Sequence, residues 1–341
     1  MDDDQQQQLQ QLQLQRLPSY DAIILSGGGA ATITFVGALR YLEHIGCLHK
    51  AGTLVGTSAG AILALLVSLG MGSHDVRAWL MENLGSGDLS SLDPERIFEF
   101  AERLGVDDGC RMLGCMRRTL QSRGVPCASG DGDPTFLELA KHTGKNLVVC
   151  AANLTLVRHE FFCVDTTPDV SVLLAVRMSF GIPLLFTPIF HRGCCYVDGG
   201  LFDNCPVDYL HRQDAPKCGS ALALSISYTP QKADDNDNVT ATTVGSGDGG
   251  NVRGPAMGVA AYVRMLLRAM FVKANAAVPC RADDPRMTVV DITPPDDAMR
   301  TMWNAFSFDE FAFRLDKTFV DHHMQHGYTA LRNAFEQSDI K

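Results

Sequence analysis

The sequence predicts an α/β fold in which buried strands alternate with helices along the chain. Two observations carry this prediction. Short apolar runs at residues 21–25 and 53–55 are each followed by a glycine-rich turn and then by a longer apolar stretch. These units follow one another in the order strand, turn, helix, strand, turn, helix, which is typical of sheets built from helical crossovers.

The composition fits one large or two small globular domains, since 46% of the 341 residues are hydrophobic. The formal net charge of −10 argues against a nucleic-acid partner. The 11 cysteines include no Cys-x-x-Cys pair, and the N-terminal residues do not resemble a secretory signal. We therefore expect reduced thiols, no metal site and an intracellular, cytoplasmic location.

The first strand covers residues 21–25 and leads into a run of three glycines at 27–29. A helix is expected next, because apolar residues recur at helical spacing over residues 35–45 and Gly46 provides a stop signal. The second strand, at residues 53–55, leads into a second sharp turn.

That second turn has the pattern of a nucleophile elbow, with the sequence Gly-Thr-Ser-Ala-Gly from Gly56 to Gly60. Small residues on both sides of Ser58 let the backbone turn sharply and present the hydroxyl at the top of the sheet. The helix that follows points its positive N-terminal end at any oxyanion formed there. The apolar run from Ala59 to Gly72 is shorter than the about 20 residues that span a bilayer, so we expect a buried helix.

The later elements follow from the same signals. Residues 73–132 are expected to form several short helices. Asp133 is the expected N-cap of the next helix, with Pro134 at its first position and Thr143-Gly144 at its end. The remaining predicted elements are a strand at 147–151, a helix at 171–178, strands at 195–197 and 221–227, a helix at 258–277, a strand at 287–292 and a helix at 309–335.

We expect a single main domain with additions at both ends. A Gln-rich disordered tail covers residues 1–18, and the catalytic domain covers 19–230. A flexible polar loop at 231–252 then precedes an extension of helices and strand at 253–341, packed on the same domain.

Ester hydrolysis at Ser58 needs an activated hydroxyl and donors for the tetrahedral oxyanion. Gly27, Gly28 and Gly29 can supply these donors, because residues without a Cβ let backbone N–H groups converge. A plain tight turn is the alternative. A dinucleotide site is not supported, since Thr32 stands where G-x-G-x-x-G requires its last glycine, and the P-loop sequence is absent, so no cofactor is expected.

Two ways of activating Ser58 remain open at the level of sequence. In a dyad, Asp198 takes the proton itself, with its basicity raised by burial. Asp198 follows an apolar run and precedes Gly199 and Gly200, which would let its carboxylate approach Ser58 closely, although Asp-Gly is also a common turn dipeptide. In a triad, the base would be one of four downstream histidines, namely His211, His322, His323 and His326.

Several segments together resemble the patatin-like phospholipase family, in which a Ser–Asp dyad hydrolyses lipid esters. The matching segments are residues 24–29 and 37–39, 56–61, 135–139 and 143–145, 178–183 and 186–188, and 196–206. The resemblance covers about residues 20–230. It implies a three-layer α/β sandwich with a central, mostly parallel sheet and helices on both faces.

The resemblance also implies that Ser58 is the nucleophile, Asp198 the base and the glycines at 27–29 the oxyanion hole. The implied activity is cleavage of fatty-acyl esters of phospholipids or glycerolipids. One departure from the family pattern is that Ala31 and Thr32 stand in place of a basic residue and a glycine. Three hypotheses therefore stand at this point: a dyad lipid hydrolase, a triad-type esterase acting on small esters, and a catalytically weakened lipid-binding homologue.

Peripheral contact with a membrane is also expected, because the implied substrates are membrane lipids. Residues 257–278 carry apolar side chains near one face together with Arg264, Arg268 and Lys273, and contain no acidic residue. These features fit a helix lying on an anionic membrane. A helix packed on the sheet with its basic residues solvated is the alternative.

Overall fold

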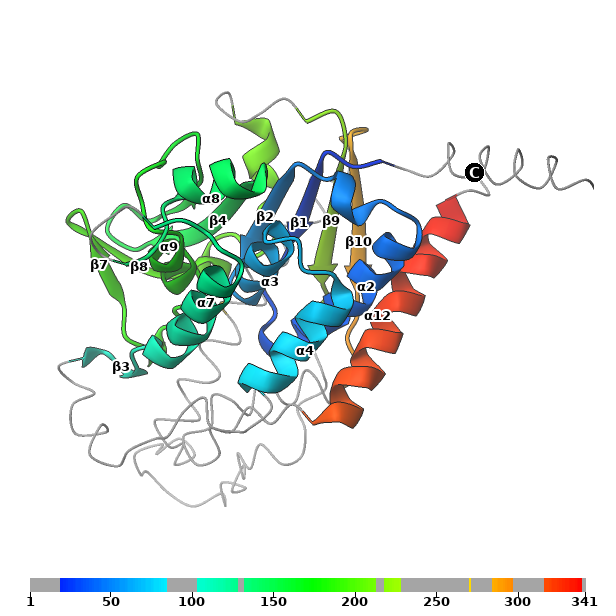
Figure 1. Cartoon of the computed structure of the whole chain (residues 1–341), viewed down its shortest axis with the longest axis horizontal. Coiled ribbons are helices and arrows are strands. Elements are labelled where there is room, and N and C mark those ends of the chain that lie inside the picture. Colours follow the sequence, from blue (N-terminus) through cyan, green and yellow to red (C-terminus); the bar gives the residue numbers. More distant parts are fainter. Residues whose placement is uncertain are drawn as a thin grey trace, which may run out of the picture.

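The computed structural model describes residues 19–84, 103–127, 132–212, 218–227, 270, 284–296 and 316–338. Within them, a central and mostly parallel sheet is flanked by helices, which confirms the predicted α/β fold (Figure 1). The predicted tail at 1–18 and loop at 231–252 lie outside the described residues. The same is true of the expected helix at 258–277, with the exception of Met270.

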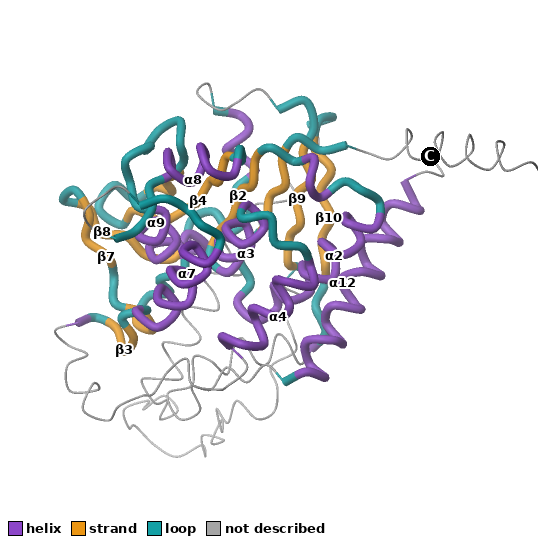
Figure 2. Tube along the Cα trace, viewed as in Figure 1, coloured by secondary structure: helices purple, strands orange, loops and turns teal. Residues whose placement is uncertain are grey.

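The strands of the central sheet form one row, which Figure 2 shows from β7 and β8 on the left to β10 on the right. In spatial order they are β10 (Met287–Ile292), β9 (Ala221–Ile226), β1 (Ala22–Leu25), β2 (Thr53–Thr57), β4 (Asn146–Asn153), β8 (Cys194–Asp198) and β7 (Ile189–His191). A further strand, β5 (Arg158–Phe162), pairs with β4 beside this row. All pairs from β10 to β4 are parallel, whereas β5, β8 and β7 pair antiparallel.

The central strands divide their side chains between two hydrophobic cores, because successive residues of a strand point to opposite faces. In β1, Ile23 and Leu25 belong to the larger core and Ile24 to the smaller one. Every residue of β1 is buried, which explains why its sequence is a continuous apolar run without polar alternation.

The α-helices of the described residues contribute side chains to the larger core. They are α2 (Ile33–His44), α3 (Ala59–Ser68), α4 (Ser73–Leu84), α7 (Cys110–Ser122), α8 (Phe136–Thr143), α9 (Val172–Ser179) and α12 (Lys317–Ser338). The smaller core on the opposite face includes Val207 and Tyr209 from the short 3-10 helix η4 (Val207–His211). None of the described helices has the length and apolar run needed to cross a membrane.

The start of α8 differs from the prediction. Thr135 is its N-cap: its hydroxyl accepts a hydrogen bond from the Glu138 N–H at 3.2 Å, and the Glu138 carboxylate accepts one from the Thr135 N–H at 2.8 Å. This capping box satisfies two donors at the helix start reciprocally. The prediction that Asp133 is the cap is wrong, because its carboxylate forms an ion pair with Arg117 at 2.6 Å.

Four short strands were not predicted from the sequence. They are β3 (Gly105–Asp107), β5, β6 (Leu184–Phe186) and β7. Three of them have only three residues, which is too short to show a strand period, and β5 begins with the polar sequence Arg-His-Glu. β3 and β6 pair in a separate two-stranded sheet.

The C-terminal helix α12 crosses α2 at two glycines, and Figure 1 shows the two helices side by side. A Cβ at Gly37 of α2 would overlap the carbonyl oxygen of Met324, and a Cβ at Gly327 of α12 would overlap that of Thr34. The missing side chains let the two helix backbones touch. This contact holds α12 against the N-terminal part of the fold.

We predict that Gly37→Ala destabilises the protein by about 2–3 kcal/mol, because the added methyl group forces two packed backbones apart. Gly114→Ala is the matched control, since Gly114 is also helical and its added Cβ would lie 3.6 Å from the nearest neighbour, Arg118 Nη1. That change should stabilise the chain by about 0.5–1 kcal/mol. Urea unfolding measures both variants, and equal effects at the two positions would contradict the proposed contact.

Candidate active site

Ser58 occupies the sharp turn between β2 and α3. β2 ends at Thr57 and α3 begins at Ala59, so the direction of the chain changes at one residue. Ser58 adopts φ 54° and ψ −126°. A positive φ is uncommon for a residue with a side chain and, where it persists, is held in place by the surrounding structure.

Gly56 and Gly60 make this turn possible, because a Cβ at either position would collide with backbone atoms. At Gly56 it would lie 2.5 Å from the carbonyl oxygen of Gly60 and 2.6 Å from Ala61 Cα. At Gly60 it would overlap the carbonyl oxygen of Leu25. The first turn of α3 therefore packs directly on the end of β1, which brings the glycine loop close to Ser58.

The Ser58 hydroxyl donates a hydrogen bond to Asp198 Oδ2 at 2.6 Å, and both residues are buried. The register of the sheet produces this approach. Thr57, the last residue of β2, pairs with Cys150 of β4. Asp198, the last residue of β8, pairs with Ala151, the next residue of β4. Two side chains that are 140 positions apart thus meet because their strands end beside adjacent residues of one strand.

Burial raises the pKa of the Asp198 carboxyl from 3.8 to about 7. The hydrogen bonds that Asp198 accepts from the Ser58 hydroxyl and from the Gly200 N–H, the latter at 2.8 Å, lower the pKa because they favour the charged form. Desolvation is the larger effect. The carboxylate is consequently a much stronger base near neutral pH than an exposed aspartate.

Gly199 is required for the same approach. A Cβ at this position would overlap the carbonyl oxygen of Cys150 and lie 3.0 Å from Thr57 Cγ2. The Gly200 N–H donates a hydrogen bond to Asp198 Oδ1, the oxygen that Ser58 does not contact. Gly199 thus leaves room for the close packing of the strands, and Gly200 provides a hydrogen-bond donor.

The three glycines after β1 have different environments. The Gly27 N–H donates to the Asn204 carbonyl oxygen at 3.0 Å, so this donor is already used. A Cβ at Gly27 would overlap Asn204 Oδ1 and lie 3.1 Å from Ser58 Cβ. The N–H groups of Gly28 and Gly29 have no acceptor in the described parts of the chain. Of the three backbone N–H groups expected from the sequence to face an oxyanion, only those of Gly28 and Gly29 are therefore still available.

Ala59 offers a further donor that the sequence analysis did not name as a site residue. It is the first residue of α3, and its N–H has no acceptor within the described ranges. Ala59 and Gly29 line the same cavity as Ser58. The N-terminal end of α3 therefore adds to the positive potential beside the hydroxyl.

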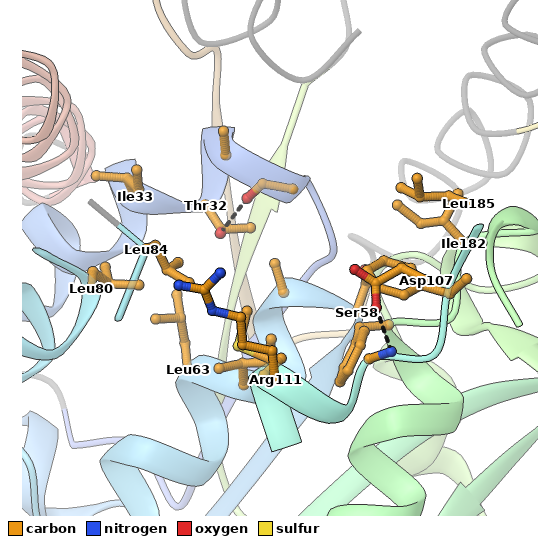
Figure 3. Close-up of a pocket in the computed structure, with 18 of the residues that line it drawn as sticks. Thr32, Ile33, Ser58, Leu63, Leu80, Leu84, Asp107, Arg111, Ile182 and Leu185 are labelled. Carbon is orange, nitrogen blue, oxygen red and sulfur yellow. Dashed lines mark hydrogen bonds between the residues drawn. The ribbon is translucent and has the colours of Figure 1, made fainter. Parts of the chain in front are cut away.

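Ala31 and Thr32, the departure from the family pattern, keep ordinary backbone geometry. They belong to the 3-10 helix η1 (Gly29–Thr32), in which Thr32 has φ −65° and ψ −10°. The positive φ of the loop, 52°, falls on Gly29. The Thr32 hydroxyl donates to the Gly29 carbonyl oxygen at 2.7 Å (Figure 3). No β-branched residue is therefore forced into a conformation that only glycine tolerates.

An apolar cavity of about 140 Å³ opens beside Ser58. Figure 3 shows Ser58 between two groups of apolar side chains, with Ile182 and Leu185 on one side and Leu63 and Leu80 on the other. Other apolar residues of its lining are Ile33, Ile62, Trp79, Leu84, Phe180 and Phe186. A cavity of this composition is suited to a hydrocarbon chain.

Within the described structure, none of the four histidines considered for a triad lines the cavity beside Ser58. His211 lies at the end of η4, where its Nε2 is 3.7 Å from the Asp284 carboxylate. The other three candidates lie on α12, namely His322, His323 and His326.

One group of side chains in the described residues has the geometry to hold a metal ion. His159, Asp203 and Asp208 place their ligand atoms within 4.8 Å of one another. The group includes neither Ser58 nor Asp198 and does not line the cavity.

A comparison with family profiles decides the classification. The profile described as Patatin-like phospholipase matches residues 23–211, which is more than half of the chain. The chain belongs to the patatin-like phospholipase family. The matched range contains both Ser58 and Asp198 as well as the glycine loop.

Two curated relatives of this patatin-like chain come from a virus and a bacterium. It is 28% identical to the probable lipid hydrolase 463L of Invertebrate iridescent virus 6. The alignment spans 231 residues and covers 62% of this chain and 72% of that protein. It is 29% identical over 221 residues to the uncharacterized protein YqhO of Bacillus subtilis, and that alignment covers 61% of this chain and 73% of YqhO.

Two solved structures that match this chain share little sequence with it. VipD from Legionella pneumophila has a TM-score of 0.48 and 17% identity, covering 94% of this chain and 67% of that one. Human GIVD cytosolic phospholipase A2, in complex with methyl gamma-linolenyl fluorophosphonate, has a TM-score of 0.46 and 12% identity. This match covers 100% of this chain and 65% of the phospholipase chain.

One contact of Ser58 was not predicted. Ser179, at the end of α9, accepts a hydrogen bond from the Ser58 N–H at 2.8 Å. The sequence shows a serine after an apolar helix, but nothing local links it to a residue 121 positions earlier. Only the packing of α9 against β4 and α3 reveals the contact.

The raised pKa of Asp198 predicts that the stability of the wild type falls, relative to Asp198→Asn, as the pH rises. The folded state holds the proton up to about pH 7, whereas the unfolded chain releases it near pH 3.8. The carboxyl's contribution is thus fully present below pH 3.8 and is lost as the pH rises through about 7.

Urea unfolding between about pH 4 and pH 8 measures this effect, and the wild-type free energy of unfolding should fall by up to about 4 kcal/mol relative to the variant. Asp198→Asn also loses one hydrogen-bond acceptor oxygen, but the effect of that loss is the same at every pH and does not alter the change with pH. Asp169→Asn is the control, since that carboxylate is 75% exposed. A wild-type-to-variant difference that does not change with pH would contradict the burial argument.

Proposed function

We propose that this chain is a serine lipid acyl hydrolase, a carboxylic-ester hydrolase that cleaves fatty-acyl esters of phospholipids or glycerolipids. The observation that carries the proposal is the 2.6 Å hydrogen bond from the Ser58 hydroxyl to a buried carboxylate of raised pKa. The apolar cavity beside this pair supports a substrate with a hydrocarbon chain. Membership of a phospholipase family supports the same reading.

In the first step, Ser58 Oγ attacks the ester carbonyl carbon while Asp198 Oδ2 accepts the hydroxyl proton. A new carbon–oxygen bond forms, and the carbonyl electron pair moves to its oxygen. The N–H groups of Gly28, Gly29 and Ala59 are the proposed donors to this oxyanion. Each such donor typically contributes about 3–4 kcal/mol to the stability of the transition state.

In the second step, the oxyanion collapses and the bond to the leaving alkoxide breaks. Protonated Asp198 gives its proton to the leaving oxygen, which leaves a fatty-acyl ester on Ser58 and a free alcohol. Water then attacks the acyl carbon, with Asp198 again accepting a proton, and the fatty acid is released as Ser58 is restored. One group with a pKa near 7 can take and return the proton at neutral pH.

The acyl chain is proposed to lie in the cavity between α3, α4, α7 and the loop before β6. Its walls are the side chains of residues such as Leu63, Trp79 and Phe180. The lipid surface that presents the substrate is the proposed partner, and peripheral contact with it remains part of the proposal. The segment expected to make that contact, residues 257–278, lies outside the described residues except for Met270.

Removal of either member of the dyad should abolish activity. We expect Ser58→Ala and Asp198→Asn each to lower kcat for fatty-acid release by about 10⁴-fold or more, because nucleophile and base act as a unit. The assay measures fatty acid released from phosphatidylcholine, phosphatidylglycerol and diacylglycerol in mixed micelles. Ser68→Ala and Asp169→Asn are the matched controls, since Ser68 is a buried helical serine outside the cavity and Asp169 is exposed.

Full activity of Asp198→Asn would overturn the dyad and favour the triad hypothesis. Loss of activity in one of the four histidine variants, His211→Gln, His322→Gln, His323→Gln or His326→Gln, would favour it as well. If the wild type releases no fatty acid, the weakened lipid-binding homologue is favoured.

The pH dependence of kcat/KM should follow the ionisation of Asp198. The base must be deprotonated to accept the Ser58 proton, so activity is expected to be lost as the pH falls below about 7 and to reach a plateau above it. A steady-state profile from pH 5 to 9 with a water-soluble ester measures this. Activity that stays on its plateau down to pH 5, as expected for an ordinary aspartate with a pKa of about 3.9, would contradict a buried base.

A further inference from the structure

The end of α9 accepts hydrogen bonds from the backbone of both dyad residues. The Ser58 N–H donates to Ser179 Oγ at 2.8 Å, and the Asp198 N–H donates to the Gly181 carbonyl oxygen at 2.9 Å. The two acceptors are only two residues apart. This short segment therefore fixes the nucleophile and the base relative to each other.

The Ser179 hydroxyl has a defined orientation because it also donates to the Cys150 carbonyl oxygen at 2.6 Å. Its hydrogen points at β4, which leaves a lone pair facing the Ser58 N–H. Cys150 is the residue of β4 that pairs with the end of β2, and the next residue pairs with Asp198. One buried hydroxyl thus joins the elbow, α9 and the strand on which both dyad residues are aligned.

Ser58 needs such a support because of its backbone conformation. Its φ of 54° is unfavourable for a residue with a Cβ, so the surrounding contacts must hold it. β2 ends one residue before Ser58 and α3 begins one residue after it, so neither the sheet nor the helix includes its N–H group. Ser179 supplies the acceptor for this buried donor.

We propose that Ser179 is a positioning residue for the reaction, an inference that rests on the proposed Ser58–Asp198 dyad. Its hydroxyl keeps the Ser58 backbone in the conformation that holds Oγ at hydrogen-bond distance from Asp198. Ser179 does not line the cavity and is fully buried, so it acts through Ser58 and does not touch the substrate.

Arg177 holds the same segment from the other side. Its guanidinium donates to the Asp108 carbonyl oxygen at 2.8 Å and to the Thr187 carbonyl oxygen at 2.6 Å. It also stacks on Phe180 and Phe186 at 5.3 and 5.2 Å, and both rings line the cavity. The end of α9 is therefore fixed between the cavity wall and the dyad, which makes its serine a rigid acceptor.

The test compares Ser179→Ala, Ser179→Cys and Ser179→Thr with wild type and with Ser68→Ala. Ser68 is the matched control, because it is also a buried serine near a helix end, but its hydroxyl bonds only within α3. Readouts are kcat and KM for p-nitrophenyl butyrate and the rate of labelling by an alkyl fluorophosphonate. Each rate is divided by the folded fraction from near-ultraviolet circular dichroism.

We expect Ser179→Ala to lower kcat and the labelling rate by about 100-fold, the scale of a 1 Å misplacement, with KM within about twofold of wild type. Ser179→Thr keeps the hydroxyl and should recover most of the rate. Ser179→Cys, a weaker hydrogen-bonding group, should fall between the two. Ser68→Ala should match wild type.

Equal labelling of Ser179→Ala and wild type would overturn the inference, as would an equal loss in Ser68→Ala. If Ser179→Ala does not fold, the order of the other two variants decides: equal rates for Ser179→Cys and wild type would overturn it. Failure of the proposed function is distinguishable, because in that case Ser58→Ala would still be labelled. An unlabelled Ser58→Ala together with a fully active Ser179→Ala would reject only this inference.

Discussion

The buried hydrogen bond between Ser58 and Asp198 is the contact on which the rest of the site depends. Its length of 2.6 Å requires β2 and β8 to end beside adjacent residues of β4. It also requires backbone without side chains at Gly56 and Gly199, where a Cβ would collide with neighbouring main chain. The sheet register, the sharp turn at Ser58 and the two glycines are thus all needed to bring the Ser58 hydroxyl within hydrogen-bond distance of Asp198.

Burial has two effects on Asp198: it makes the carboxylate a stronger base, and it costs free energy to keep the charged form out of water. Removing the Asp198 carboxylate from water disfavours its charged form and raises its pKa to about 7. The Ser58 hydroxyl and the Gly200 N–H offset part of that cost, so the group still ionises near neutral pH. In the proposed dyad, a base of this strength takes the place of the histidine that a Ser-His-Asp triad sets beside its nucleophile.

Sequence reasoning identified the alternation of strands and helices and the residues that the structure brings together at Ser58 and Asp198. It succeeded there because each lies in a short segment whose local chemistry is distinctive. It treated Gly27 like its two neighbours, because the bond to Asn204 depends on a residue far along the chain. The same limit hid the contact of Ser179: its segment, residues 178–183, was matched to the family, but the partner of its hydroxyl lies on another element. The cap of α8 was missed by two residues because Asp133 and Thr135 are both good N-cap residues. Two observations separate them: Thr135 has Glu138 three residues later and forms a capping box with it, and Asp133 pairs with Arg117.

Trapping the covalent intermediate tests the central claim most directly. The protein is mixed with a long-chain p-nitrophenyl ester, quenched in acid within the first turnover, digested and analysed by peptide mass spectrometry. We expect one peptide, the one that contains Ser58, to carry the mass of the fatty-acyl group, because the hydroxyl bound to Asp198 is the attacking atom. An acyl group on a different residue, or release of product with no acylated peptide at any quench time, would contradict the account.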